Sequence, residues 1–126
     1  MDLERLSEIR ERLLGRYSLF PRNGCLPASI EVFNDLGFPL KAGYILTKNG
    51  VKKHNWNEDF QGNIVDLSFS QFEEDFGYSL DEIIVFPKEN VIHKYGYIEN
   101  ETLTSSLIDF VKKKRYLPQF EVSFLV

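Results

Sequence analysis

Hydrophobic residues recur every three or four positions near the N-terminus, and charged residues occupy the positions between them. This spacing predicts an amphipathic helix that ends near Gly15. Its apolar face is expected to consist of Leu3, Leu6, Ile9, Leu13 and Leu14. The next stretch, residues 18–24, combines proline, asparagine and glycine and therefore predicts a loop.

A second helix is expected to begin at Cys25 and to end at Leu36. Pro27 is acceptable in its first turn, because the N–H group that proline lacks would have no partner there. Gly37 is suited to close the C-terminus of this helix. The pattern therefore places Cys25 at a helix N-terminus.

Strand-like segments follow the second helix. Residues 40–48 and 51–58 flank Asn49-Gly50, a pair that tolerates the positive φ angles of a tight hairpin turn. Further elements are expected as a strand over 64–67, a short helical or irregular stretch over 68–76, a strand over 83–86, a helix over 102–115 and a strand over 120–126. This order of helices and mostly antiparallel strands predicts one α+β domain over residues 1–126.

The composition agrees with one packed domain. Of 126 residues, 43% are hydrophobic and 27% charged, which is typical of globular proteins rather than disordered ones. The single cysteine cannot form an intrachain disulfide, which favours a reducing compartment. No stretch reaches the ~20 apolar residues of a membrane span, and the charged N-terminus lacks the apolar core of a signal peptide. We therefore expect a cytoplasmic protein; delivery as a toxin or effector is compatible with the same sequence.

The net charge of −4 gives no electrostatic reason to expect a polyanionic partner. The one basic run, residues 112–115, fits cations near the negative end of a helix dipole, and a nucleic-acid or membrane binder would depend on that run alone. Two histidines and one cysteine show no metal-ligand spacing. We expect no metal, cofactor, nucleic acid or membrane as a partner, and the sequence does not indicate an oligomeric state.

Three residues far apart in the chain supply the groups of a nucleophilic triad. A thiol at a helix N-terminus is favoured as thiolate, and it needs an imidazole that a third group orients. Cys25, His54 and Asp66 match these roles, since a turn at Gln61-Gly62 would place the strands of His54 and Asp66 side by side. Taken singly, these residues also suit a packed thiol, a strand residue and a turn carboxylate.

In chain order these residues resemble the transglutaminase-like branch of papain-fold proteins. NGCLPAS, KHNWNED and GNIVDLSFSQF are similar to its Cys, His-x-Trp-x-Glu and Gly-x-hydrophobic-x-Asp-hydrophobic-Ser/Thr blocks, over about residues 23–72. The segment VDLSFSQF is particularly similar to the small bacterial members. The resemblance implies a papain/transglutaminase-like fold, with the nucleophile helix packed on a mostly antiparallel sheet.

The resemblance also implies Cys25 as nucleophile, His54 as general acid and base, and Asp66 as the group that orients His54. The branch includes transglutaminases, arylamine acetyltransferases, peptidase-like proteins and toxin domains that deamidate glutamine. The expected function is cysteine-dependent acyl transfer on a protein, peptide or small amide, by hydrolysis, glutamine deamidation or transglutamination.

Two further residues are candidates for contacting a substrate. Asn23 supplies the nearest side-chain amide before Cys25 and is a candidate oxyanion donor. Trp56 shares the strand face of His54 and can shield it from water or contact substrate. The alternative function is that of a catalytically inactive papain-fold module that binds other proteins.

Overall fold

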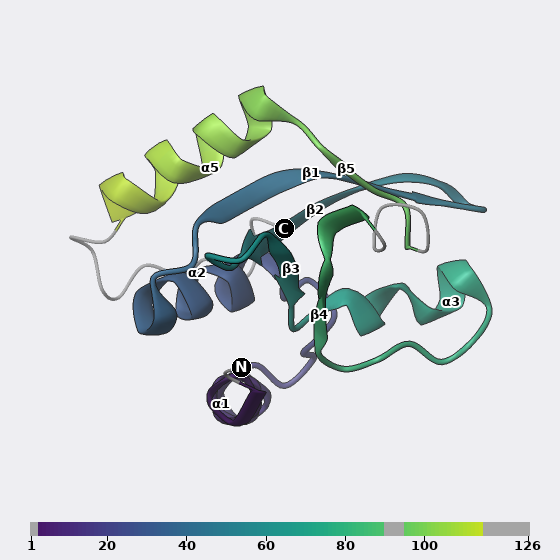
Figure 1. The fold of residues 1–126 in the computed structure, drawn as a ribbon. Coiled ribbons are helices and arrows are strands. Elements are labelled where there is room, and N and C mark those ends of the chain that lie inside the picture. The colour runs from purple at the N-terminus through teal and green to yellow at the C-terminus, as the bar shows by residue number, and fades with distance from the viewer. Residues whose placement is uncertain (1–2, 90–94, 115–126) are drawn as a thin grey trace.

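An antiparallel sheet lies at the centre of the computed structural model, which describes residues 3–89 and 95–114. Its strands within these residues are β1 (Leu40–Thr47), β2 (Gly50–Glu58), β3 (Asn63–Asp66), β4 (Ile84–Pro87) and β5 (Tyr97–Glu99). They lie in the order β4-β3-β2-β1-β5, and every neighbouring pair is antiparallel. Figure 1 shows that the sheet is curled rather than flat.

Helices pack against this sheet. In the described part of the chain they are α1 (Leu3–Arg16), α2 (Cys25–Leu36), α3 (Glu73–Phe76) and α5 (Glu101–Lys114), and a 3₁₀ turn, η1 (Phe69–Phe72), precedes α3. Helix α2 packs against β2 and α1, whereas α5 packs against β1 (Figure 1). The predicted α+β class, with the second helix on an antiparallel sheet, is therefore confirmed. None of the described helices combines the length and apolar character needed to cross a membrane.

The buried face of α1 is narrower than its sequence suggests. Leu6, Ile9 and Leu13 are buried in a cluster shared with α2 and β3. Leu3 and Leu14 were expected on the same face, but they are 50% and 38% exposed. They lie at the borders of the apolar stripe, where a neighbouring element covers only part of a helix.

Arg10 was expected on the polar side of α1 and is instead buried. Its Nε donates to the backbone carbonyl of Leu67 at 3.3 Å, and its Nη1 donates to Glu82 at 3.2 Å. Its guanidinium also lies 5.5 Å from the centre of the Phe20 ring. These contacts satisfy the charge, so that the stem of the side chain can join the core.

Helix α2 has the predicted boundaries. At its C-terminus, Gly37 adopts a left-handed φ of 73°, and its N–H donates to the Phe33 carbonyl at 2.8 Å. At its N-terminus, a Cβ on Gly24 would lie 2.5 Å from a ring carbon of Phe20. Glycine is therefore required immediately before Cys25.

The hairpin turn between β1 and β2 is shifted by one residue from the prediction. Thr47 pairs with Gly50, so the loop residues are Lys48 and Asn49 rather than Asn49 and Gly50. The Thr47 hydroxyl donates to the Gly50 carbonyl at 2.8 Å and accepts from the Asn49 N–H at 3.1 Å. This side chain stabilises the shifted turn, and Gly50, with φ of 110°, becomes the first residue of β2.

The later elements agree less closely with the sequence pattern. Strand β3 begins and ends one residue earlier than expected, and the pattern did not predict β5. Strand β5 has only three residues and follows Gly96, whose φ is 75°. The strand expected over 120–126 and the last residue of the basic run, Arg115, lie outside the described residues.

Three hydrogen bonds to the backbone of Ala42 in β1 fix the start of α5. The pairing of β1 with β5 ends at Gly43 and Glu99. Beyond this pair, the Ala42 carbonyl accepts from the Asn100 N–H at 3.0 Å and from the Thr104 hydroxyl at 3.1 Å. The Ala42 N–H donates to the same Thr104 hydroxyl at 3.0 Å. Helix α5 is thereby held across the end of β1.

Gly43 lies at the tightest contact of this region, since a Cβ there would lie 2.0 Å from the Ile98 carbonyl oxygen. We expect Gly43→Ala to lower the free energy of unfolding by about 1–3 kcal/mol, because β5 must move away from β1. Urea denaturation measures this change. The control is Gly15→Ala in α1, where a Cβ meets nothing within 4 Å, and which should stabilise by about 0.5–1 kcal/mol. Equal effects of the two substitutions would contradict the close approach.

Candidate active site

Cys25 is the first residue of α2 and is 1% exposed. Among the residues that the structure describes, no side chain caps this helix N-terminus. Because the first N–H groups of a helix have no partner within it, they favour negative charge at this position. The structure therefore places the Cys25 side chain at a helix N-terminus, as the sequence predicted.

His54 and Asp66 form a buried pair. Strand β2 carries His54 and β3 ends with Asp66, and the two strands are antiparallel neighbours. The His54 Nε2 and the Asp66 Oδ2 lie 2.6 Å apart, and the two side chains are 0% and 1% exposed. The structure thus brings together two of the three residues predicted for the triad.

Two further residues hold the Asp66 carboxylate in place. Its Oδ1 accepts from the Ser68 N–H at 2.9 Å and from the Ser68 hydroxyl at 3.3 Å. Its Oδ2 also accepts from the Tyr97 hydroxyl at 2.5 Å, across the sheet from β5. A carboxylate with this many donors is fixed in position and satisfied as an anion.

These contacts set the protonation of the pair. Burial alone would lower the pKa of His54, but the Asp66 carboxylate raises it from 6.5 to about 10. Burial alone would raise the pKa of Asp66, but the positive charge of His54 lowers it. Burial and the Asp66 charge together raise the pKa of Tyr97 well above its usual value, which keeps its hydroxyl a donor. The pair is therefore imidazolium and carboxylate at neutral pH.

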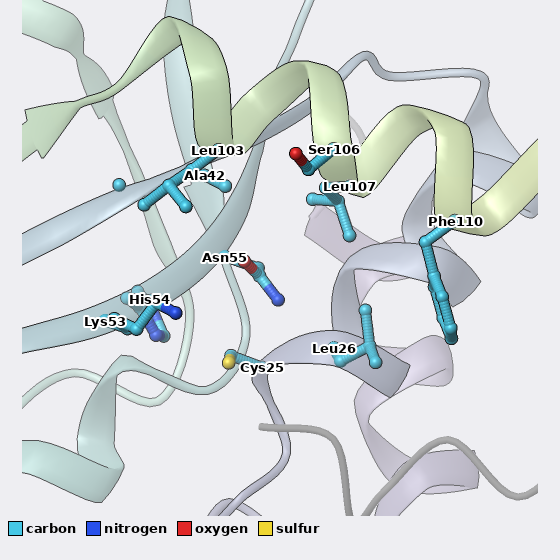
Figure 2. A pocket seen from close by; sticks show the side chains of 11 residues that line it. Cys25, Leu26, Ala42, Lys53, His54, Asn55, Leu103, Ser106, Leu107 and Phe110 are labelled. Carbon is cyan, nitrogen blue, oxygen red and sulfur yellow. The ribbon is translucent and has the colours of Figure 1, made fainter.

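The second ring nitrogen of His54, Nδ1, points away from Asp66. Nδ1 is buried and has no hydrogen-bond partner of normal geometry among the described residues. After Asp66, the Cys25 sulfur is the other group whose proximity raises the pKa of His54. Figure 2 shows the Cys25 and His54 side chains at the same end of one cavity. A thiol beside an imidazole that a carboxylate orients supplies the groups of nucleophilic cysteine chemistry.

Aromatic rings enclose the other sides of His54. The ring of Phe72 lies edge-on at 5.0 Å between centroids, and that of Trp56 is stacked at 6.1 Å. Trp56 is 3% exposed and packs edge-on against Tyr97. Trp56 therefore lies beside His54, as the sequence predicted. It does not line the cavity, so its packing fits exclusion of water better than contact with a substrate.

A cavity of about 340 Å³ opens against Cys25 and His54, and we call it the Cys25 cavity. Its walls come from α2, β1, β2 and α5 (Figure 2). The residues that line it are Cys25, Leu26, Ala42, Gly43, Lys53, His54, Asn55, Leu103, Ser106, Leu107 and Phe110. A substrate in this cavity would reach the sulfur and the imidazole together.

Asn23, the amide predicted as an oxyanion donor, is exposed and does not line the Cys25 cavity. Its φ of 54° belongs to the tight turn that leads into α2. Asn55 lines the cavity instead, and its side chain extends into the space between α2 and α5 in Figure 2. Within the described residues, no hydrogen bond of the Asn55 amide is found. Asn55 is thus the better placed amide.

The sequence pattern did not point to Asn55, Ser68 or Tyr97 as functional. Asn55 and Ser68 lie inside the segments that carry the family resemblance, so attention to the neighbours of His54 and Asp66 could have found them. Tyr97 is 31 residues from Asp66 and belongs to the strand that the pattern missed. No local signal marks it, because its role depends on sheet pairing.

No group of three or more His, Cys, Asp or Glu side chains in residues 3–89 and 95–114 is arranged to hold a metal ion. Comparisons with family models, curated proteins and solved structures give no match to this chain. The resemblance to the transglutaminase-like branch therefore stays a prediction.

The pKa of His54 predicts how stability depends on pH. Its contribution to folding is complete below the usual pKa of 6.5 and is lost as pH rises through about 10. The free energy of unfolding should therefore fall from neutral to alkaline pH, by up to about 1.4 kcal/mol per pH unit from this group. Urea denaturation followed by the fluorescence of Trp56, the single tryptophan, measures it.

The control is His54→Gln, which removes the titrating group and leaves all other alkaline titrations in place. For this variant we expect the free energy of unfolding to depend less on pH between neutral and alkaline solution. Parallel curves for the two proteins would contradict the buried ion pair. At acid pH the contribution of Asp66 is lost as pH falls through its lowered pKa, so the stability of the parent protein should hold into mildly acid solution.

Proposed function

We propose that this protein is a cysteine-dependent acyl-transfer enzyme that acts on amides, with Cys25, His54 and Asp66 as its catalytic triad in a papain/transglutaminase-like arrangement. One observation carries the proposal. The hydrogen-bonded chain from Tyr97 through Asp66 to His54 ends at Nδ1, which has no hydrogen-bond partner of normal geometry among the described residues, and this ring shares a cavity with the sulfur of Cys25. A buried, fully supported imidazole beside a thiol is the constellation of nucleophilic catalysis.

In the proposed reaction, the Cys25 thiolate attacks the carbonyl carbon of the amide, and the carbonyl π electrons move to the oxygen. The C–N bond then breaks as the His54 imidazolium gives a proton to the departing amine, which leaves a thioester on Cys25. Water attacks the thioester while His54 takes its proton, and the acid and the thiolate are released. A second amine in place of water would give transamidation.

Asp66 supports both stages by keeping His54 charged and oriented. In the resting state, it stabilises the imidazolium that pairs with the thiolate. When His54 loses its proton to the amine, the hydrogen bond to Asp66 keeps the ring aimed toward the sulfur. Ser68 and Tyr97 act through Asp66 and are positioning residues.

The negative oxygen of the intermediate needs donors. The N-terminus of α2 supplies the N–H of Cys25, and the Asn55 side chain supplies an amide inside the same cavity. We therefore assign to Asn55 the role that the sequence suggested for Asn23. Hydrolysis, glutamine deamidation and transglutamination all use these groups, and they differ in the acyl donor and acceptor.

The burial of Cys25, at 1% exposed, favours a second candidate function. A module that has lost turnover could keep the same residues as a packed polar cluster and bind other proteins with its outer surface. The two candidates differ in one property, which is whether a reagent entering the cavity meets an activated thiol.

The first test is alkylation of Cys25 by iodoacetamide at about pH 6. An ordinary thiol is only about 0.3% thiolate there, so activation by His54 should raise the rate on the order of 10- to 100-fold above the unfolded chain in concentrated urea. Intact mass measures the adduct, and the chain has one cysteine to label. His54→Ala should abolish the enhancement. Equal rates for folded and unfolded protein would favour the non-catalytic module.

The second test concerns Asn55. Asn55→Ala should slow acylation of Cys25 by p-nitrophenyl acetate by about 10- to 1,000-fold, because the oxyanion loses a donor. Alkylation by iodoacetamide forms no oxyanion, so its rate should not change in the same variant. Asn23→Gly is the matched control, because glycine removes the amide and tolerates the φ of 54° at this position, and it should leave both rates unchanged. A loss in Asn23→Gly alone would restore the original assignment.

A further inference from the structure

We infer that the acyl group transferred by Cys25 is apolar, and that the Cys25 cavity is the site that binds it. This inference rests on the proposed function and narrows it to one class of substrate. It depends on which side chains line the cavity and on where the polar ones lie.

Apolar side chains form most of the wall away from the sulfur. Leu26 follows Cys25 in α2, and Leu103, Leu107 and Phe110 come from one face of α5. Leu26 and Leu107 are 3% and 7% exposed and belong to the core cluster that joins α2, β1 and α5. These side chains are fixed by packing, so the cavity does not depend on a mobile surface loop.

Polar atoms gather at the other end. Cys25, His54 and Asn55 lie together there, where the carbonyl of a substrate must be placed (Figure 2). No aspartate or glutamate is among the residues that line the cavity in the described structure, and the one cation, Lys53, is exposed. The α5 wall has one hydroxyl, that of Ser106. Along the apolar wall of Leu26, Leu107 and Phe110, a charged or strongly polar acyl group would lose its water without gaining a partner.

The geometry therefore orients the substrate. Its carbonyl lies between the sulfur and Asn55, and the chain on the acyl side extends along Leu107 toward Phe110. A cavity of about 340 Å³ is at the small end of ligand sites, which suits one short aliphatic or aromatic acyl group better than an extended peptide. The side chain of glutamine, with its polar acyl donor on a peptide, fits this site less well.

The test uses p-nitrophenyl esters of acetate, butyrate and hexanoate. The Cys25 thiolate attacks the ester carbonyl, the C–O bond breaks, and p-nitrophenolate leaves, so its absorbance reports formation of the thioester. Each rate is divided by the rate of the same ester with N-acetylcysteine, which removes differences in intrinsic reactivity. We expect this ratio to rise roughly fourfold for each methylene that the cavity buries.

Two substitutions on α5 separate the cavity from a general change in the protein. Ser106→Phe places a ring in the cavity and should remove the advantage of hexanoate over acetate while acetate still reacts. Ser105→Phe makes the same change at the neighbouring exposed residue, which does not line the cavity, and should leave the chain-length dependence intact. Equal behaviour of the two variants would overturn the inference.

The outcomes also separate this inference from the proposed function. If every ester acylates Cys25 faster than N-acetylcysteine but the ratio does not depend on chain length, the apolar acyl site is wrong and the catalytic triad stands. A succinyl ester that reacts faster than the butyryl ester would also overturn the apolar site. If no ester acylates Cys25 faster than the free thiol, and iodoacetamide shows no dependence on His54, the proposed function itself fails.

Discussion

The ion pair between His54 and Asp66 is the interaction on which the rest of the site depends. Taking two charges out of water costs several kcal/mol for each, so such a pair persists only when its remaining hydrogen-bonding groups are satisfied. Ser68 and Tyr97 satisfy the carboxylate, and aromatic rings exclude water from the imidazole. Within the described part of the chain, the group of this pair that is left without a hydrogen-bond partner is the Nδ1 of His54, and its ring lines the cavity beside Cys25.

The fold delivers these groups from separate layers. Gly24 lets the chain turn into α2 so that Cys25 begins the helix. Asn57 of β2 donates at 3.0 Å to the Ser29 carbonyl in α2 and at 3.1 Å to the Phe38 carbonyl just after this helix. Thr104 then fixes α5 on β1. The cavity is the space that remains between the two helices and the sheet, so its shape follows from packing rather than from any one motif.

Local chemistry predicted part of this structure. The glycine after Leu36 and the proline in the first turn defined α2, and the proximity of His54 to Asp66 followed from two neighbouring strands. The burial of Arg10, the support of Asp66 by Tyr97 and the position of Asn55 in the cavity could not be predicted, because each depends on elements distant in sequence. The hairpin turn was misplaced by one residue for a different reason: the Thr47 hydroxyl competes with the backbone preference of Asn-Gly.

Strand β1 separates the imidazole from the edge of the sheet, since Gly43 pairs with His54 on one side and with Glu99 on the other. Strand β5 is short, lies at that edge and carries Tyr97. Local opening is easiest at such an edge, where few pairings must break. Detachment of β5 would take the phenolic donor away from Asp66 while α1 and α2 stay folded. The free energy needed to disable the site in this way is lower than the free energy of unfolding the whole domain.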